Sequence, residues 1–229
     1  MSTRKPTTVA LMGLLTVLAG CRDVPDTPLT AAAAAGRIAE IETLLAAGAD
    51  VDDRDDNDLT PLAWAARHGR LHTIRVLLDH GADPDLPAGG NDWPPLVHAV
   101  HKGADLCVIE LLDAGADIEG SGGRRALLMA AGYGNAEIVR EMLGRGADPH
   151  IDGILTDAVA GAWDIDYQWS GCEPHTETVR ALLEAAPDLE LEDDFFGRRA
   201  LSKARKRGCT ELVELVGSEE PRDQAARLD

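Results

Sequence analysis

His98 and His101 lie three residues apart and would face the same side of a helix. Imidazole pairs can ligate a metal, but the surrounding sequence offers no third ligand. Asp164 and Asp166 could bind calcium, yet the glycine and the distal glutamate of a calcium-binding loop are missing. The patterns G-x-x-x-x-G-K-S/T, H-E-x-x-H and G-x-S-x-G do not occur either. We therefore expect a protein that is not an enzyme and that has no metal or cofactor.

The composition limits the kind of core and the kind of partner. Of 229 residues, 45 % are hydrophobic but only 3 % are aromatic, so the core must be built from Ala, Leu and Val in thin layers. The formal net charge is −18, from 40 acidic and 22 basic side chains. This balance argues against a general nucleic-acid binder, because such proteins neutralise phosphates with Lys and Arg. A local cationic site is still compatible with this negative net charge.

The first residues of the chain have the pattern of a targeting segment. Arg4 and Lys5 precede an uncharged stretch, residues 9–18, which is too short to cross ~30 Å of hydrocarbon as a helix. It leads into the sequence Leu-Ala-Gly-Cys21. This sequence resembles a bacterial lipobox, which implies that residues 1–20 are a signal peptide and that Cys21 is acylated. A plain secretory peptide and a buried N-terminal helix are the alternatives.

The same resemblance implies a location in the bacterial cell envelope. Arg22, rather than an aspartate, follows the cysteine, and this favours the outer membrane, facing the periplasm, over retention in the inner membrane. We therefore expect the chain to contact a membrane only through its lipid anchor. Residues 21–26 would then be a short tether.

The body of the chain repeats itself at intervals of about 33 residues. The string Gly-Ala-Asp, shortly after an apolar pair, occurs at 48–50, 81–83, 115–117 and 146–148. A second string starts with Thr-Pro-Leu and ends with Gly, and it occurs at 27–36 and 60–69, with degraded copies at 94–103, 125–134 and 199–208. In each unit Thr would cap a short helix, Pro would occupy its first turn, and Gly would end it. A second, amphipathic helix would carry the apolar pair.

This unit resembles the ankyrin repeat, whose Thr-Pro-Leu and Gly-Ala-Asp strings are present almost verbatim. The resemblance implies an all-α solenoid of five to six helix-turn-helix repeats over residues 27–217, with β-turn loops between the repeats. Single units of this kind cannot bury their apolar faces, so they must stack. Residues 218–229 are expected to be a polar C-terminal tail.

The fifth unit departs from the pattern through an insertion, residues 163–175, that holds two Trp and one Tyr. The insertion is either functional or a local plug over the helix turn. It contains Cys172, which we place at the same helix-to-helix turn as Cys209 one repeat later. Because neighbouring repeats stack ~10 Å apart, we predict a Cys172–Cys209 disulfide; the alternative is two free thiols. Cys107 falls on an inward helix position and is expected to be an inert buried thiol.

In ankyrin proteins, the loop tips and the ends of the first helices form the contact face. Carried over to this chain, the resemblance implies a set of partner-binding residues that is rich in cations and rings: Arg67, His68, Trp93, His101, Lys102, Arg124, Tyr133, Phe195, Phe196, Arg198, Lys206 and Arg207. Arg and aromatic side chains anchor many interfaces, so we expect a docking groove for an acidic protein surface. The alternative is that residues 198–207 are a solvated terminal cap.

The sequence thus favours non-catalytic protein binding at the cell envelope, without nucleic acid. Two roles fit this function, namely an immunity protein for a secreted toxin and an envelope scaffold or stress-protection factor. A remote alternative is a metal-binding or enzymatic accessory centred on the insertion at 163–175.

Overall fold

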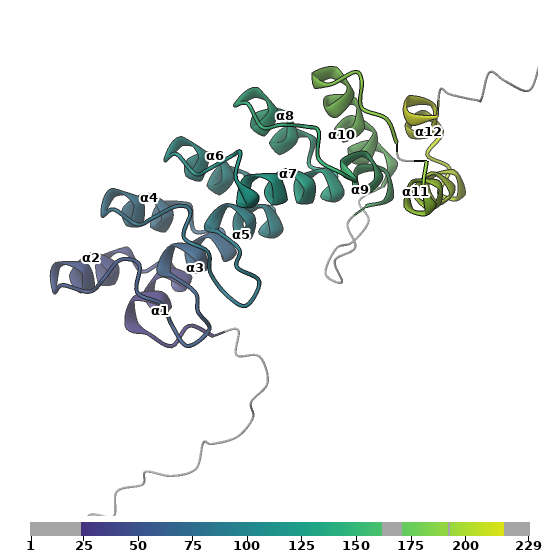
Figure 1. Ribbon diagram of the computed structural model, residues 1–229. Coiled ribbons are helices and arrows are strands. Elements are labelled where there is room, and N and C mark those ends of the chain that lie inside the picture. Colours follow the sequence, from purple (N-terminus) through teal and green to yellow (C-terminus); the bar gives the residue numbers. More distant parts are fainter. Residues whose placement is uncertain (1–23, 162–170, 192, 218–229) are drawn as a thin grey trace, which may run out of the picture.

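The computed structural model describes residues 24–161, 171–191 and 193–217, and these residues form twelve α-helices and no β-strand (Figure 1). The first helices of the successive pairs are α1 (Pro28–Ala35), α3 (Pro61–Arg67), α5 (Pro95–Lys102), α7 (Ser121–Tyr133), α9 (Ile154–Ala160) and α11 (Phe195–Lys206). The second helices are α2 (Ile38–Ala46), α4 (Leu71–Asp79), α6 (Asp105–Asp113), α8 (Ala136–Gly144), α10 (Cys172–Ala185) and α12 (Thr210–Val216). The predicted signal peptide, Cys21 and the predicted tail lie outside the described residues, as does most of the predicted insertion.

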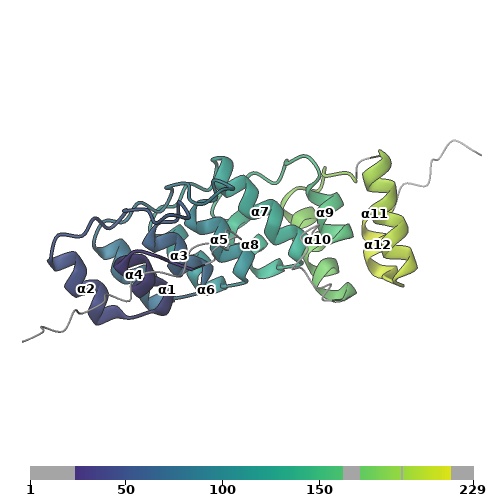
Figure 2. The same ribbon diagram turned by 90° about the horizontal axis from the view of Figure 1, so that it is seen from below.

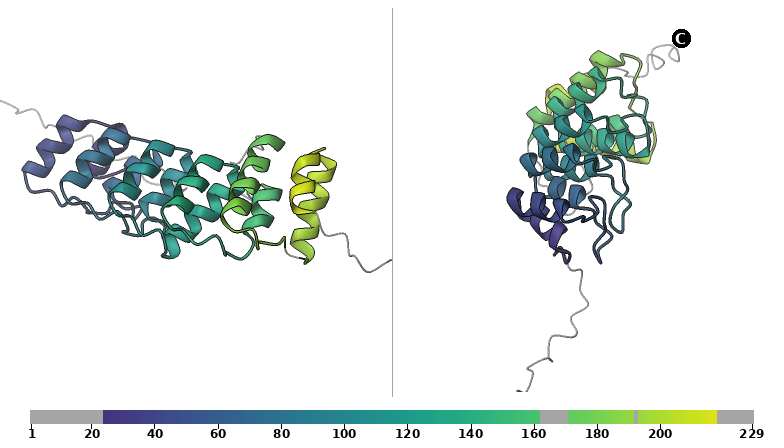
Figure 3. Two further views of the ribbon diagram at one scale, coloured as in Figure 1. Left: turned by 90° about the horizontal axis from the view of Figure 1, so that it is seen from above. Right: turned by 90° about the vertical axis from the view of Figure 1, so that its left-hand side faces the viewer.

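The helix pairs stack in sequence order into one elongated solenoid. Helices α1, α3, α5, α7, α9 and α11 lie side by side in one row, here called the inner row (Figure 1). The second helices form an outer row beside it, and the connections between pairs run along one side of the stack (Figures 2 and 3). The predicted all-α repeat fold is therefore confirmed. In the ranges that the structure describes, no helix is both long and apolar enough to span a membrane.

Local sequence explains where the first two inner helices begin and end. Thr27 and Thr60 cap α1 and α3, and each side-chain oxygen accepts from the backbone N–H three residues later, at 3.2 and 3.1 Å. A proline follows each threonine, at the position where a helix loses nothing by a missing N–H. Helix α1 ends at Gly36, whose φ of 76° would strain any residue that carries a Cβ.

Small side chains form the contacts within the inner row. The pairs Ala32–Ala33, Ala65–Ala66 and Ala130–Ala131 occupy equivalent places in three inner helices, and all six side chains are fully buried. Because these residues have little bulk, neighbouring helices approach closely and each pair contributes only a thin layer of core. Stability therefore depends on the neighbours in the stack.

Carboxylates join the loops of neighbouring repeats. The Asp52 carboxylate accepts from the backbone N–H of Asp83 at 3.2 Å, and that of Asp85 accepts from the backbone N–H of Asp117 at 2.8 Å. Partial burial raises the pKa of both Asp52 and Asp85 above the usual value. The last residues of two Gly-Ala-Asp strings, Asp83 and Asp117, are thus hydrogen-bonded to the preceding repeat.

Three helices begin earlier than the repeat strings predict. Helix α7 begins at Ser121 instead of Arg125 and α11 at Phe195 instead of Arg199, because no proline stands there to stop the helix from extending toward its N-terminus. Helix α10 begins at Cys172, so the last four residues of the predicted insertion are helical and do not form a turn. Pro174 does not prevent this, since it lies in the first turn of the helix.

The end of the predicted tether is also bound to the stack. The carbonyl of Val24 accepts from the side-chain amide of Asn57 at 3.0 Å, and the carboxylate of Asp26 accepts from the backbone N–H of Asp56 at 3.1 Å. Residues 24–26 are thus fixed to the loop before α3.

Candidate protein-binding face

The last turn of α3 carries a stacked group of side chains. Trp64 is fully buried, and its Nε1–H donates to the Asp55 carboxylate at 2.7 Å. The ring of His68 stacks on the indole, with centroids 5.6 Å apart and planes 10° apart. Arg67 lies over the same indole, its guanidinium carbon 5.7 Å from the centroid, where a cation is attracted to the ring face. Two of the predicted binding residues are therefore held by one buried ring.

Asp55 is a residue that the sequence analysis missed. It is 7 % exposed and also accepts from the backbone N–H groups of Asn57 (2.9 Å) and Leu59 (3.0 Å). It fixes the indole that supports Arg67 and His68. In the sequence Asp55 is one of several aspartates in a polar stretch. It differs from the others only through its hydrogen bond to Trp64 on the next helix, which the sequence does not show.

A second group of rings connects α5 to α7. Trp93, just before α5, meets the rings of His98 and His101 edge-on, with centroids 5.5 and 5.3 Å away. Nδ1 of His101 lies 2.7 Å from the phenol oxygen of Tyr133 on α7, at hydrogen-bond distance. Lys102 follows His101 at the end of α5 and is exposed. The structure thus brings four predicted residues of two repeats into one surface.

His98 packs beneath these rings as a buried side chain. It is 5 % exposed, and burial lowers its pKa to about 4, so the ring is neutral at pH 7. Its Nε2 is buried without a hydrogen-bond partner. Across the described ranges, no group of three or more His, Cys, Asp or Glu side chains could hold a metal ion.

The remaining predicted residues lie on α7 and α11. Phe195 and Phe196 open α11 with 63 % and 54 % of their surface exposed, and Arg198 pairs with Asp193 at 2.8 Å. Lys206 is exposed at the other end of the helix. Arg124, in the first turn of α7, is exposed as well.

Arg207 has a packing role that the sequence analysis did not assign. Its guanidinium donates to the carbonyl of Ala160 at 3.3 Å, and Nζ of Lys203 donates to the same carbonyl at 2.7 Å. Burial lowers the pKa of Lys203. Ala160 is the last residue of α9, where helix carbonyls lack partners and carry partial negative charge. Lys203 and Arg207 therefore dock α11 on the end of α9.

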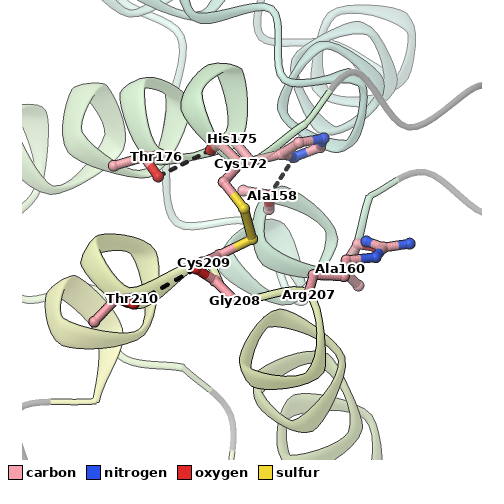
Figure 4. Close-up of a disulfide and its surroundings, with 9 residues drawn as sticks. All are labelled: Ala158, Ala160, Cys172, His175, Thr176, Arg207, Gly208, Cys209 and Thr210. Carbon is pink, nitrogen blue, oxygen red and sulfur yellow. Dashed lines mark hydrogen bonds between the residues drawn. A yellow bond between two sulfur atoms is a disulfide. The ribbon is translucent and has the colours of Figure 1, made fainter.

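A disulfide joins the last two repeats. The Sγ atoms of Cys172 and Cys209 are 2.07 Å apart and their Cα atoms 5.3 Å apart (Figure 4). The bond connects the first residue of α10 to the N-cap of α12. It is the pair that the sequence analysis proposed, although Cys172 lies in a helix and not in a turn. Cys107 is a buried free thiol, and burial raises its pKa to about 11.

His175, beside this disulfide, was not singled out from the sequence. Its ring is fully buried, and Nδ1–H donates to the carbonyl of Ala158 at 2.7 Å (Figure 4). Burial lowers its pKa to about 4, so the ring is neutral at pH 7. It therefore anchors α10 to α9 as a hydrogen-bond donor.

Comparison with known proteins agrees with this geometry. A family model for ankyrin repeats, in three copies, matches residues 9–88, and a model for a single ankyrin repeat matches residues 122–154. The crystal structure of an ankyrin repeat domain from Acinetobacter baumannii AYE is similar to the chain, with a TM-score of 0.68 and 27 % sequence identity. The similarity covers 82 % of this chain and 95 % of that one. The chain has the ankyrin-repeat fold. No curated protein matched the sequence.

Ankyrin repeats are protein-interaction modules and typically not enzymes. In this ankyrin stack, the predicted binding residues fall into two separate places. One set lies on the inner helices α3, α5 and α7 or directly beside their ends, namely Arg67, His68, Trp93, His101, Lys102, Arg124 and Tyr133. The other set belongs to the last repeat, namely Phe195, Phe196, Arg198, Lys206 and Arg207. The match to residues 9–88 begins within the predicted signal peptide, so residues 9–20 have two competing interpretations.

Proposed function

We propose that this ankyrin protein is a lipid-anchored, non-catalytic binding module of a bacterial cell envelope, and that it captures an acidic protein surface on its inner row. The observation that carries the proposal is two groups of rings and cations on neighbouring inner helices, one at the end of α3 and one across α5 and α7. Indole, imidazole and phenol rings there lie in contact, with Arg67 and Lys102 at the ends of their helices. Such residues are enriched among interface anchors.

The electrostatics of the whole chain make this surface selective. With a net charge of −18, most of the molecule repels an acidic protein. An acidic partner would therefore be attracted mainly at the cationic positions, which favours one binding orientation over others. Rings that are already held in place also lose little side-chain entropy when a partner binds.

The location that we propose rests on the sequence around Cys21. Acylation there would hold the module at the outer membrane, facing the periplasm, without a membrane-spanning helix. The more specific role that we propose is immunity, in which the module neutralises a toxin delivered to the periplasm. The support for this role is the combination of a periplasmic address with a binding face and without catalytic motifs.

The binding face is tested by neutralising two of its cations. The full chain, carrying Arg67→Gln and Lys102→Gln, is immobilised and used to capture proteins from envelope extract of the source cells. We expect the partner retained by the wild type to be lost. A matched control, Arg75→Gln with Arg140→Gln, removes two cations from the outer helices α4 and α8 and should still retain it.

Equal retention by both double variants contradicts the assignment of the face, provided that circular dichroism shows intact helices. The immunity role has its own test, which is co-expression with a toxin encoded beside this gene. Survival that requires this protein supports immunity. Death despite its expression contradicts immunity and leaves the protein-binding proposal to the capture experiment.

A further inference from the structure

The last inner helix, α11, exposes two large apolar side chains that the stack does not use. Phe195 is 63 % exposed and Phe196 is 54 % exposed, although phenylalanine is usually buried. Their rings meet edge-on with centroids 5.5 Å apart. The helix start that carries them is fixed by Asp194, whose side chain accepts from the backbone N–H of Gly197 at 2.7 Å. The two rings therefore form a small apolar knob on an ordered support.

The same helix is the most basic segment of the chain. Residues 198–207 hold six Arg or Lys and no acid, whereas residues 21–197 hold 34 acidic and 12 basic side chains. Lys203 and Arg207 contact α9, as described above. Arg205 and Lys206 are exposed, and the structure describes no ion pair for either of them. Packing against α9 uses only Lys203 and Arg207, so it does not account for the other positive charges of α11.

Phe195 and Lys206 are eleven residues apart, about three helical turns, and so lie on the same side of α11. We propose that Phe195, Phe196 and Lys206 form a second docking surface, at the end of the solenoid, for an acidic protein segment that carries apolar side chains. This inference rests on the proposed protein-binding function and extends it beyond α3, α5 and α7. The rings would pack against apolar side chains of the segment, and the Lys206 ammonium would pair with one of its carboxylates. Aromatic and cationic anchors of this kind commonly dominate the affinity of an interface.

The residues around the knob favour a protein segment over a bilayer. Asp193 and Asp194 directly precede the two rings and are exposed, as is Asp188 in the same connection. A flat anionic membrane surface would meet these carboxylates at the same time as the rings, and like charges would repel. A protein segment can place its own carboxylates at α11 and leave Asp193 and Asp194 in water.

The test uses the full chain and a fluorescein-labelled peptide of repeated Asp-Glu-Leu units, followed by fluorescence anisotropy. A second peptide, with Asn and Gln in place of Asp and Glu, shows how much of the binding affinity depends on the negative charges of the peptide. We expect the acidic peptide to bind more tightly. Phe195→Ala with Phe196→Ala should weaken binding at least about 10-fold. Lys206→Gln should weaken it and also reduce its dependence on salt.

Two control variants separate this surface from the rest of the molecule. Leu106→Ala removes another exposed apolar side chain, 66 % exposed on α6, and should leave binding unchanged. Arg75→Gln with Arg140→Gln removes two cations from α4 and α8 and should also leave the peptide affinity unchanged. If Arg67→Gln with Lys102→Gln abolishes peptide binding while the phenylalanine variant does not, the α11 surface is overturned and the proposed function stands.

Three further outcomes would overturn the proposal. In the first, the wild type binds neither peptide. In the second, it binds phosphatidylglycerol vesicles through Phe195 and Phe196 and does not bind the acidic peptide. In the third, sedimentation shows self-association that the phenylalanine variant abolishes, which would identify a second copy of the chain as the occupant. Failure of the proposed function would appear separately, as no partner in the envelope-extract capture.

Discussion

The phenol oxygen of Tyr133 lies 2.7 Å from Nδ1 of His101, so one side-chain hydrogen bond connects α7 to α5 across the candidate face. His101 is also in edge contact with Trp93, 5.3 Å between centroids. The rings that we assign to partner binding are therefore held by one another before any partner arrives. A surface organised in this way connects binding to the stability of the central repeats.

Replacing Tyr133 by Phe tests this connection. The change removes the hydroxyl and keeps the ring, so we expect the free energy of unfolding to fall by about 1 kcal/mol, the usual net value of such a bond. Urea unfolding followed by circular dichroism measures the effect. An unfolding free energy identical to that of the wild type would show that the bond contributes nothing to the stack.

The disulfide makes a larger and separable contribution. Cys172 and Cys209 are 37 residues apart in sequence, and closing a loop of this length in the unfolded chain is worth about 3–4 kcal/mol. We expect dithiothreitol to lower the stability by roughly this amount and to expose α11 and α12 to protease first, because terminal repeats unfold most easily. Cys107→Ala is the control and should respond to dithiothreitol as the wild type does.

The two buried histidines predict how stability depends on pH. Burial lowers the pKa of both His98 and His175 to about 4, from the usual value of 6.5. Between these values the unfolded chain binds more protons than the folded chain. The contribution of each ring is therefore fully present above about pH 6.5 and is lost as the pH falls toward 4.

The expected loss at about pH 5 is on the order of 2 kcal/mol for each ring. Urea unfolding near pH 7 and near pH 5 measures it. His175→Asn keeps an N–H donor near Ala158 and does not titrate, so this variant should lose less stability on acidification than the wild type. The same loss in both proteins would show that His175 is not responsible.

Acylation of Cys21 is tested by Cys21→Ser in cells. Without the thiol no lipid can be attached, so we expect the variant to move from the membrane fraction to the soluble periplasmic fraction. Mass spectrometry of the wild type should find the mature chain beginning at an acylated Cys21. A variant that still requires detergent for extraction would contradict lipid anchoring.

The repeat pattern predicts most of this fold because its elements are local. Thr27 and Thr60 cap helices, Gly36 ends one, and Ala32 and Ala33 permit close packing, and each of these follows from residue type and spacing. The early starts of α7, α10 and α11 were not predicted in this way. For α7 and α11 the missing proline is visible in the sequence, but it does not by itself show how far the helix extends toward its N-terminus.

The sequence predicted which positions belong to the candidate face, but it did not predict which side chains contact one another there. The family resemblance places Arg67, His101 and Tyr133 at the ends of inner helices. It does not show that a buried carboxylate, Asp55, orients the indole under Arg67, or that Arg207 is directed toward Ala160. Arg207 and Ala160 are more than one repeat apart in the sequence and come together only when the repeats stack. Asp55 lies closer to Trp64, but several neighbouring aspartates look equivalent to it in the sequence.

The covalent bond between Cys172 and Cys209 makes the two ends of the solenoid mechanically unequal. The C-terminal end is locked, while at the other end α2 buries only Ile41 and relies on non-covalent contacts. Under a pulling force, or in spontaneous local unfolding, α1 and α2 should unfold before α11 and α12 as long as the disulfide is intact. The repeat next to the proposed anchor is then the compliant one, and the distal end stays rigid.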